Sequence, residues 1–536
     1  MARYEIEAIG RFLLSMVKFD PTFVITKFTH FFKVTKITPM GRVLLEQFLL
    51  QNVHKGFRQP NPYRYRTNKE PVDKVYGLAT QDLLEYRFHI GQLNPLQEFL
   101  NRRGLDVGLY RIDHASLHDP VRIDMKIREE WKLRERQPDV VEFILKPMES
   151  DHHSRLVTLP MGEGKGFISL WAISERKYRT ALFILPQYIG KWAAEIKEKT
   201  TATDRDIMIV QGGDSLRGLI ELGQSSRYHS SFVLFSMRTW TNFIDSYLLD
   251  RRYCIEDEYG CSPDEIFDLL GIGTVVFDEI HQHMHAVYKT LCFMNVDKVI
   301  GLSATFLSKD YFIDKMQRIL FPKEIRFEEV KMKKYIRAYG ISYSISNESM
   351  KKIRTTERRS SVYSQNAFED SILKCRPILE SYMELVIEVV ESGFMDEYQP
   401  GYRCIIFVRK VEMCDTIVLH LRKKWPHLDI RRYAPSAGDP YENLMDPDIR
   451  VTTQIGAGTG HDIKGLMTTI TLDNINSAVA NIQTLGRLRE PKEGTARYFS
   501  VYSESIKKHA YYAKERRHLL SDRVASYKEF KSNVSL

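Results

Sequence analysis

Residues 155–175 read RLVTLPMGEGKGFISLWAISE, and this stretch determines how the rest of the sequence is interpreted. A short apolar run, a turn with three glycines and an amphipathic stretch follow one another, which predicts a strand, a loop and a helix. The same alternation continues to about residue 305 through the apolar runs TALFILP, DIMIVQG, SFVLFSM, GTVVFDE and DKVIGLSAT. Strands that alternate with helices predict a parallel sheet that is covered by helices on both faces.

A second series of the same kind begins with RCIIFVR at residues 403–409 and continues through the helical pattern VEMCDTIVLHLRKKW. Four further apolar runs, DIRRYA, DIRVTTQ, MTTITLD and ARYFSVY, bring the series to residue 502. Between the two series, residues 331–400 contain a polar linker or insertion and then the amphipathic segment ILESYMELVIEVVESGF, which predicts an entry helix. The fold class is therefore α/β, with two lobes in tandem.

The sequence before about residue 119 lacks this rhythm and mixes short segments rich in Pro, Tyr and Arg, which indicates a separate small α+β domain. We expect an N-terminal domain at residues 1–118, a first lobe at 119–335, a second lobe at 336–505 and a basic helical tail at 506–536. The basic residues of this tail are Lys507, Lys508, Lys514, Arg516 and Arg517.

Composition narrows the class of protein. The 536 residues are 43% hydrophobic and 27% charged, as in packed globular domains, and the net charge of +9 suits a polyanionic partner. Six scattered cysteines without a CxxC pair give no zinc-site or disulfide pattern. No secretion signal and no apolar run of about 18 residues is evident, so we expect a cytoplasmic protein without a membrane partner.

The glycine-rich turn carries the first chemical signal. Gly162, Glu163, Gly164, Lys165 and Gly166 lie where a strand passes into a helix. Glycines let backbone N–H groups surround a phosphate, the helix N-terminus favours negative charge, and a lysine here would contact the β- and γ-phosphates. An ordinary strand-to-helix turn is the alternative for this segment taken alone.

The second signal is VVFDEIH at residues 275–281, an apolar strand that ends in Asp278 and Glu279. One carboxylate can hold Mg²⁺ through water, and a second can orient or deprotonate an attacking water molecule. Asp278 fits the first role and Glu279 the second. A solvated acidic strand end is the alternative, but the preceding phosphate loop favours a nucleotide site.

In this order, the two segments resemble motifs of superfamily 2 helicases and translocases of the DExH type. Residues 301–305, GLSAT, resemble the family's motif that couples hydrolysis to DNA contact. Residues 458–462, GTGHD, and 483–489, QTLGRLR, resemble its motifs V and VI. The resemblance covers roughly residues 121–502 and implies two RecA-like lobes, ATP as substrate and Mg²⁺ as cofactor.

The resemblance also implies roles for single residues. Arg487 would act as an arginine finger on the γ-phosphate, with Gln483 of the same motif in the catalytic site. Gly460 and Asp462 of motif V would contact the nucleotide, and Gln137 would read the adenine.

Two positions depart from the family pattern. Gly166 stands where the family has Ser or Thr, so the hydroxyl that ligates Mg²⁺ is absent and we expect water to replace it. Glu490 occupies the place of the second arginine of motif VI, and Arg489 stands one residue earlier.

Candidate nucleic-acid contacts lie outside the nucleotide motifs. Residues 57–69 interleave aromatics with Arg58, Arg64 and Arg66, a pattern that suits phosphate binding and base stacking, although a solvated basic loop is the alternative. Arg238 and Thr239 follow a predicted strand where the family holds the nucleic-acid backbone, and an ordinary loop is the alternative there.

The order of features in the N-terminal domain and the ending after IQTLGRLRE are similar to the phage branch-migration helicases of the UvsW type. This similarity implies a phage-encoded enzyme in the host-cell cytoplasm that acts on duplex, forked or branched DNA, with replication or recombination proteins as partners. The alternatives are an RNA helicase, a motor subunit of a nuclease complex, and a catalytically silent DNA-binding scaffold, the last suggested by Gly166.

Overall fold

The computed structural model describes residues 21–50, 54–57, 71–74, 76–104, 110–147, 152–160, 162–304, 310–328, 334–357, 362–454, 463–491 and 494–536. These residues form two compact units. The first contains the described residues up to Leu159 together with Gly164–Glu328, and the second contains the described residues of Pro160–Glu163 and Glu329–Leu536. Each unit is described by itself.

The N-terminal part of the first unit is a mixed five-stranded sheet in the order β5-β6-β2-β1-β7, where β1 pairs with β7 in parallel and the other pairs are antiparallel. Its strands are β1 (Val24–Lys27), β2 (Phe31–Thr35), β5 (Leu78–Ala79), β6 (Tyr86–His89) and β7 (Arg111–His114). Helices α2 (Pro39–Leu50) and α3 (Leu93–Asn101) pack on it, and β3 (His54–Phe57) pairs with β4 (Pro71–Lys74). The expected α+β class of this part is confirmed, and it belongs to the same compact unit as the first lobe.

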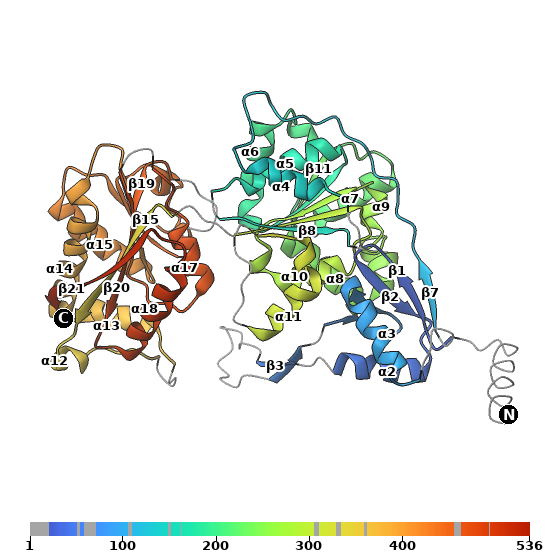
Figure 1. The fold of residues 1–536 in the computed structure, drawn as a ribbon, viewed down its shortest axis with the longest axis horizontal. Coiled ribbons are helices and arrows are strands. Elements are labelled where there is room, and N and C mark those ends of the chain that lie inside the picture. Colours follow the sequence, from blue (N-terminus) through green and yellow to red (C-terminus); the bar gives the residue numbers. More distant parts are fainter. Residues whose placement is uncertain are drawn as a thin grey trace, which may run out of the picture. The chain divides into compact units, whose positions relative to one another are not determined.

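The first large sheet is entirely parallel, in the order β10-β11-β9-β12-β13-β8-β14. Two of its strands, β8 and β11, are labelled in Figure 1. Its strands are β8 (Ser154–Thr158), β9 (Thr180–Ile184), β10 (Ile207–Val210), β11 (Phe232–Ser236), β12 (Thr274–Phe277), β13 (Lys298–Ser303) and β14 (Arg326–Glu328). The main helices around it are α4 (Gln137–Leu145), α5 (Lys165–Arg176), α6 (Ile189–Lys199), α7 (Gly213–Gln224), α8 (Met237–Leu249), α10 (Met284–Leu291) and α11 (Tyr311–Leu320).

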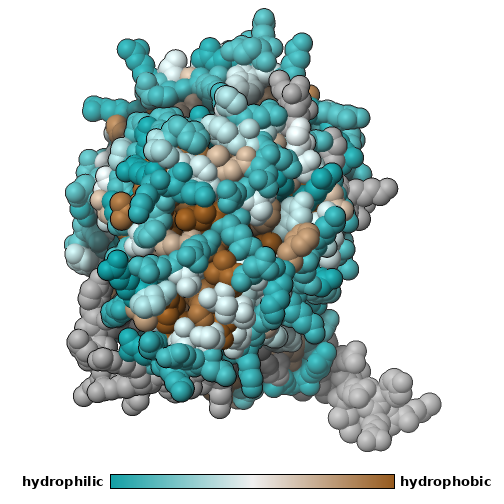
Figure 2. All heavy atoms as spheres, turned by 90° about the vertical axis from the view of Figure 1, so that its left-hand side faces the viewer, coloured by the Kyte–Doolittle hydropathy of each residue, from teal (hydrophilic) through white to brown (hydrophobic). Residues whose placement is uncertain are grey.

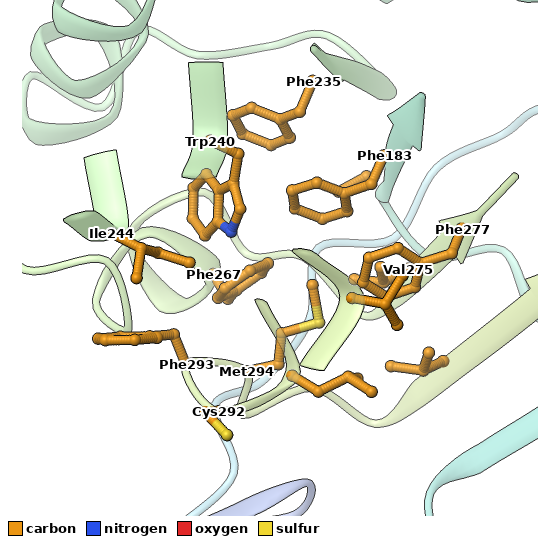
Figure 3. Packing of buried hydrophobic residues seen from close by; sticks show 14 of the residues in the cluster. Phe183, Phe235, Trp240, Ile244, Phe267, Val275, Phe277, Cys292, Phe293 and Met294 are labelled. Carbon is orange, nitrogen blue, oxygen red and sulfur yellow. The ribbon is translucent and has the colours of Figure 1, made fainter. Parts of the chain in front are cut away.

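Alternate residues of the strands enter two different cores, because successive side chains of a strand point to opposite faces. Phe183 of β9 and Phe277 of β12 join the aromatic cluster around Trp240 of α8, where their rings gather together (Figure 3). Leu182 and Val276, their neighbours along the same strands, join the core under α5 and α6. Both faces of the sheet are therefore covered, as the uninterrupted apolar runs predict.

The N-terminal sheet shares the aromatic core of the first lobe. Phe31 of β2 and Tyr76 are both buried in that cluster, and the Tyr76 hydroxyl donates to the carbonyl oxygen of Phe312 at 3.0 Å. Arg87 of β6 is 1% exposed and forms ion pairs with Glu85 and with Asp264 of the lobe. We call this set of contacts the seam, and it joins the N-terminal sheet to the first lobe.

The second unit is built on a parallel sheet in the order β17-β18-β16-β19-β20-β15-β21. Its strands are β15 (Ile336–Ser344), β16 (Arg403–Val408), β17 (Ile430–Tyr433), β18 (Ile449–Thr453), β19 (Leu466–Thr471), β20 (Ala496–Ser503) and β21 (Ser526–Ser535). Its main helices are α13 (Gln365–Lys374), α14 (Arg376–Gly393), α15 (Val411–Lys424), α17 (Ala478–Leu485) and α18 (Lys507–Leu520). Two parallel α/β lobes are thus present, as in tandem RecA-like domains.

Every strand expected from the apolar runs of the two series is observed, and so are the entry helix α14 and helix α15. The sequence did not indicate β14, β15 or β21. The segment expected as a basic helical tail contains α18 and then β21, which pairs with β15 in the sheet. Arg516 of α18 is buried and donates to Oδ1 of Asn481 at 2.9 Å and to Oγ of Ser500, so it serves lobe packing.

The side of the second lobe that bears α14 is mostly hydrophilic, with small apolar areas between polar side chains (Figure 2). Among the described helices, none is long and apolar enough to cross a membrane.

Candidate nucleotide site and nucleic-acid interface

The phosphate loop connects β8 to α5 in the first lobe. Gly162 and Gly164 have φ values of +88° and +76°, in the left-handed region that favours glycine. Gly164 caps the N-terminus of α5, and Lys165 is the first residue of that helix. The Lys165 ammonium group donates to the carbonyl oxygen of Leu159 at 3.0 Å, so the lysine side chain folds back over its own loop.

Gln137, the first residue of α4, lies against this loop. A Cβ atom at Gly164 would be only 2.6 Å from Nε2 of Gln137, so glycine is required for this close approach. The Gln137 side-chain oxygen accepts a hydrogen bond from the backbone N–H of Arg134 at 2.9 Å, which fixes the amide orientation. The glutamine is therefore beside the phosphate loop, although its role toward adenine stays a prediction.

The two carboxylates follow β12, which is separated from β8 by β13 alone. Asp278 accepts a hydrogen bond from Nε1 of Trp192 on α6 at 2.8 Å. Glu279 adopts a left-handed backbone conformation with φ of +48°, which is strained for a residue with a side chain. Its Oε2 atom is buried and makes no hydrogen bond among the described residues, although Nδ1 of His281 lies 3.4 Å away. A buried acceptor without a hydrogen bond is costly, so this atom is suited to a bound water molecule or substrate.

The electrostatic environment sets the protonation of these groups. Burial, helped by the charge of Glu279, raises the pKa of Asp278 to about 6, whereas the hydrogen bond from Trp192 and the charge of Lys165 oppose the rise. Burial and the charge of Lys165 lower the pKa of His281 to about 4, so its ring is neutral at pH 7. Nδ1 of His281 is 2.8 Å from Oγ of Ser303, which links the acidic motif to the end of β13.

Gly166 is the second residue of α5, and the side chain of Glu195 lies beside it. A Cβ atom at position 166 would be 2.9 Å from Oε1 and 3.2 Å from Oε2 of Glu195 on α6. Glu195 forms an ion pair with Lys199 at 2.5 Å, and both side chains are mostly buried, with 17% and 15% exposed. Sequence reasoning missed Glu195, because only the packing of α6 brings it to the site.

These residues fit a nucleotide with a divalent cation. Within the first unit, the loop presents the left-handed Gly164 and a helix N-terminus, Lys165 supplies a positive charge, and Glu279 has a buried oxygen that makes no hydrogen bond among the described residues. The first lobe thus brings together Gly164, Lys165, Gly166, Gln137 and the two carboxylates.

The remaining predicted residues belong to the second unit or lie outside the described residues. Arg487 is buried just after α17, and Gln483 is half-buried on that helix. Arg489 donates to the carbonyl oxygen of Gly486, which stabilises the turn that carries Arg487. Gly460 and Asp462 lie outside the described residues.

The predicted nucleic-acid contacts of the first lobe are at the N-terminus of α8. Arg238 is exposed, whereas Thr239 is buried and its hydroxyl accepts a hydrogen bond from the N–H of Gly212 at 2.8 Å. Thr239 therefore ties the turn before α7 to that before α8. Arg58, Arg64 and Arg66 lie outside the described residues.

A basic groove lies between the N-terminal sheet and α11, with a volume of about 570 Å³. Its floor is closed by the turn at Gly91, where a Cβ atom would be 2.7 Å from the carbonyl oxygen of Ile319. None of the described residues that line it is acidic. The basic side chains that line it are Lys27, His114, His152, Lys315 and Arg318. No sequence pattern indicates this groove, because its residues come from five separate segments of the chain.

No protein-family model and no curated protein matches the sequence. Among solved structures, the chain is similar to T4 UvsW, with 13% identity, a TM-score of 0.33, and coverage of 95% of this chain and 99% of that chain. It is similar to the Pyrococcus furiosus Hef helicase domain, with 13% identity, a TM-score of 0.41, and coverage of 72% and 98%. It is also similar to S. cerevisiae Dbp5 bound to RNA and ADP BeF3, with 12% identity, a TM-score of 0.46, and coverage of 74% and 89%. Similarity at this level concerns the fold alone.

Proposed function

We propose that this chain is an ATP-dependent DNA helicase or translocase of superfamily 2 that remodels branched DNA. The observation that carries the proposal is one site in the first lobe. The loop that leads to Lys165 follows β8, the carboxylates of Asp278 and Glu279 follow β12, and only β13 lies between these two strands. We further propose that the enzyme is of the DExH type and phage-encoded, and that it acts in recombination or replication in the host-cell cytoplasm.

Each residue of the first lobe has a defined task in this proposal. The N–H groups of Gly164, Lys165 and Gly166 bind phosphate oxygens, and the ammonium group of Lys165 leaves Leu159 to contact the β- and γ-phosphates. Asp278 would hold Mg²⁺, and Glu279 would orient and deprotonate the attacking water molecule with its buried Oε2 atom, which makes no hydrogen bond among the described residues. When bound, Mg²⁺ neutralises charge on the transferred phosphoryl group.

The assignments of five further residues rest on the family resemblance. Gln137 reads adenine, which its position beside Gly164 supports. Arg487 stabilises the negative charge that develops on the γ-phosphate, and Gln483, Gly460 and Asp462 complete the nucleotide site of the second lobe.

The basic groove supports nucleic acid as the partner, because a phosphate backbone is bound chiefly by cationic side chains. Together with Arg238 and the segment that contains Arg58, Arg64 and Arg66, it would contact the backbone with little sequence preference. We propose DNA, in duplex or branched form, because the N-terminal domain adds this basic surface to the lobes.

One experiment tests the proposal. ATP turnover is measured with no nucleic acid, single-stranded DNA, duplex DNA, forked DNA and RNA, with Lys165→Ala as the inactive control. We expect turnover that rises most with forked DNA. If RNA but no form of DNA stimulated turnover, the substrate would be RNA. If no condition gave turnover, the result would favour the DNA-binding scaffold.

A further inference from the structure

Position 166 is one of the two places where this chain departs from the family pattern, and it is the one in the phosphate loop. A serine or threonine there would offer a hydroxyl oxygen to Mg²⁺, and glycine offers none. Mg²⁺ requires near-octahedral oxygen coordination, so the missing oxygen must come from elsewhere.

The carboxylate of Glu195 occupies the space that the missing side chain would fill. Its two oxygens are 2.9 and 3.2 Å from the position of a Cβ atom at Gly166, closer than side-chain atoms normally approach a Cβ. A serine or threonine at position 166 would therefore clash with the Glu195 carboxylate unless one of the two side chains moved. Glycine at this position is therefore matched to the presence of Glu195.

Helix α6 also contacts Asp278, the carboxylate that is proposed to hold the cation. Trp192 donates to Asp278, and Glu195 lies three residues later, on the same face of the helix. One helix face thus contacts both the end of β12 and the first turn of α5.

The Glu195 carboxylate already binds a positively charged group, the ammonium group of Lys199. This ammonium group also lies 5.0 Å from the ring centre of Trp131 and 5.4 Å from that of Phe167. These aromatic rings can retain the ammonium group when a stronger cation takes its place at the carboxylate.

We propose that Glu195 supplies the oxygen ligand for the divalent cation that Gly166 does not provide. This inference rests on the proposed ATPase function. A carboxylate is a hard oxygen donor of the kind that Mg²⁺ prefers, and its negative charge makes it a stronger ligand than a neutral hydroxyl. Glycine and glutamate together thus replace the hydroxyl of the family.

The test measures Mn²⁺ binding to the full chain with a non-hydrolysable ATP analogue, by the loss of the free Mn²⁺ signal in electron paramagnetic resonance. Glu195→Gln should weaken Mn²⁺ binding by about tenfold or more. Glu198→Gln, on the exposed face of α6, is the matched control and should bind as the wild type does. The double variant Gly166→Ser with Glu195→Ala restores a hydroxyl without a clash and should recover most of the affinity.

A second variant separates a ligand from a packing role. Lys199→Met breaks the same ion pair but leaves the carboxylate, so Mn²⁺ binding should be unchanged or tighter. Equal weakening by Lys199→Met and Glu195→Gln would overturn the ligand assignment, as would unchanged Mn²⁺ binding by Glu195→Gln. Failure of the wild type to bind the analogue with or without Mn²⁺ would overturn the proposed function itself.

Discussion

Arg87→Ala should destabilise the first unit strongly, because Arg87 is the charged centre of the seam. Its guanidinium group is 2.5 Å from Oε1 of Glu85 and 3.1 Å from Oδ1 of Asp264. It also lies 4.0 Å from the ring centre of Phe293. Removing one partner of a buried ion pair leaves the other charge uncompensated, at a cost of about 3–5 kcal/mol.

The pH dependence of this effect has a defined sign. Burial alone would raise the pKa of Asp264, but Arg87 and Lys33 outweigh it and the pKa lies below its ordinary value. A lowered pKa contributes stability above the ordinary value, and that contribution is lost as the pH falls. Without Arg87 the carboxyl group can accept a proton, so the difference between variant and wild type should shrink in acid.

Unfolding in urea, followed by tryptophan fluorescence, measures the change. Four of the five tryptophans, Trp131, Trp171, Trp192 and Trp240, belong to the first unit. Arg111→Ala is the matched control, because its pair with Asp113 in the same N-terminal sheet is exposed and should contribute less than about 1 kcal/mol. If Arg87→Ala cost no more than Arg111→Ala, the seam would not depend on this charge network.

Three further predictions concern the nucleotide site. Glu279→Gln should lower DNA-stimulated turnover by about 10²–10⁴-fold and leave binding of an ATP analogue intact, because an amide cannot accept the proton; wild-type turnover would refute its role. Arg487→Ala should lower the maximal rate by about 10³-fold or more with little change in analogue affinity, and a normal rate in stopped-flow assays would remove Arg487 from the site. Because the pKa of Asp278 is raised to about 6, metal-dependent analogue binding should weaken as the pH falls through 6, and a flat titration from pH 5 to 8 would contradict this. The same raised pKa means that ionised Asp278 costs folding stability as the pH rises from about 4 to 6, the opposite of Asp264.

The sequence predicts the strands that are buried on both faces, because these read as uninterrupted apolar runs. It does not predict β15, whose sequence IRAYGISYS lies in a polar region, or β21, which is an edge strand with mostly exposed side chains. Only the pairing of these strands with their neighbours reveals them. Local sequence carries little information about partners so distant along the chain.

The candidate site also contains residues that the sequence predicts and one residue that it does not. Lys165 and the carboxylates lie in contiguous segments whose order is informative, so they can be found without coordinates. Glu195 has no local signal, because an amphipathic helix with Glu and Lys four residues apart is ordinary. Its significance appears only when α6 is packed against Gly166.

The seam also has a consequence for the synthesis of the chain on the ribosome. Arg87 precedes its partner Asp264 by 177 residues. At about 5–20 residues per second, the N-terminal sheet waits roughly 10–35 s before that partner is made. During this interval Phe31, Tyr76 and Arg87 have no lobe to pack against, so the nascent N-terminal sheet exposes apolar surface and a charge awaiting its pair. Chaperone binding during translation should therefore concentrate on this segment until the first lobe has emerged.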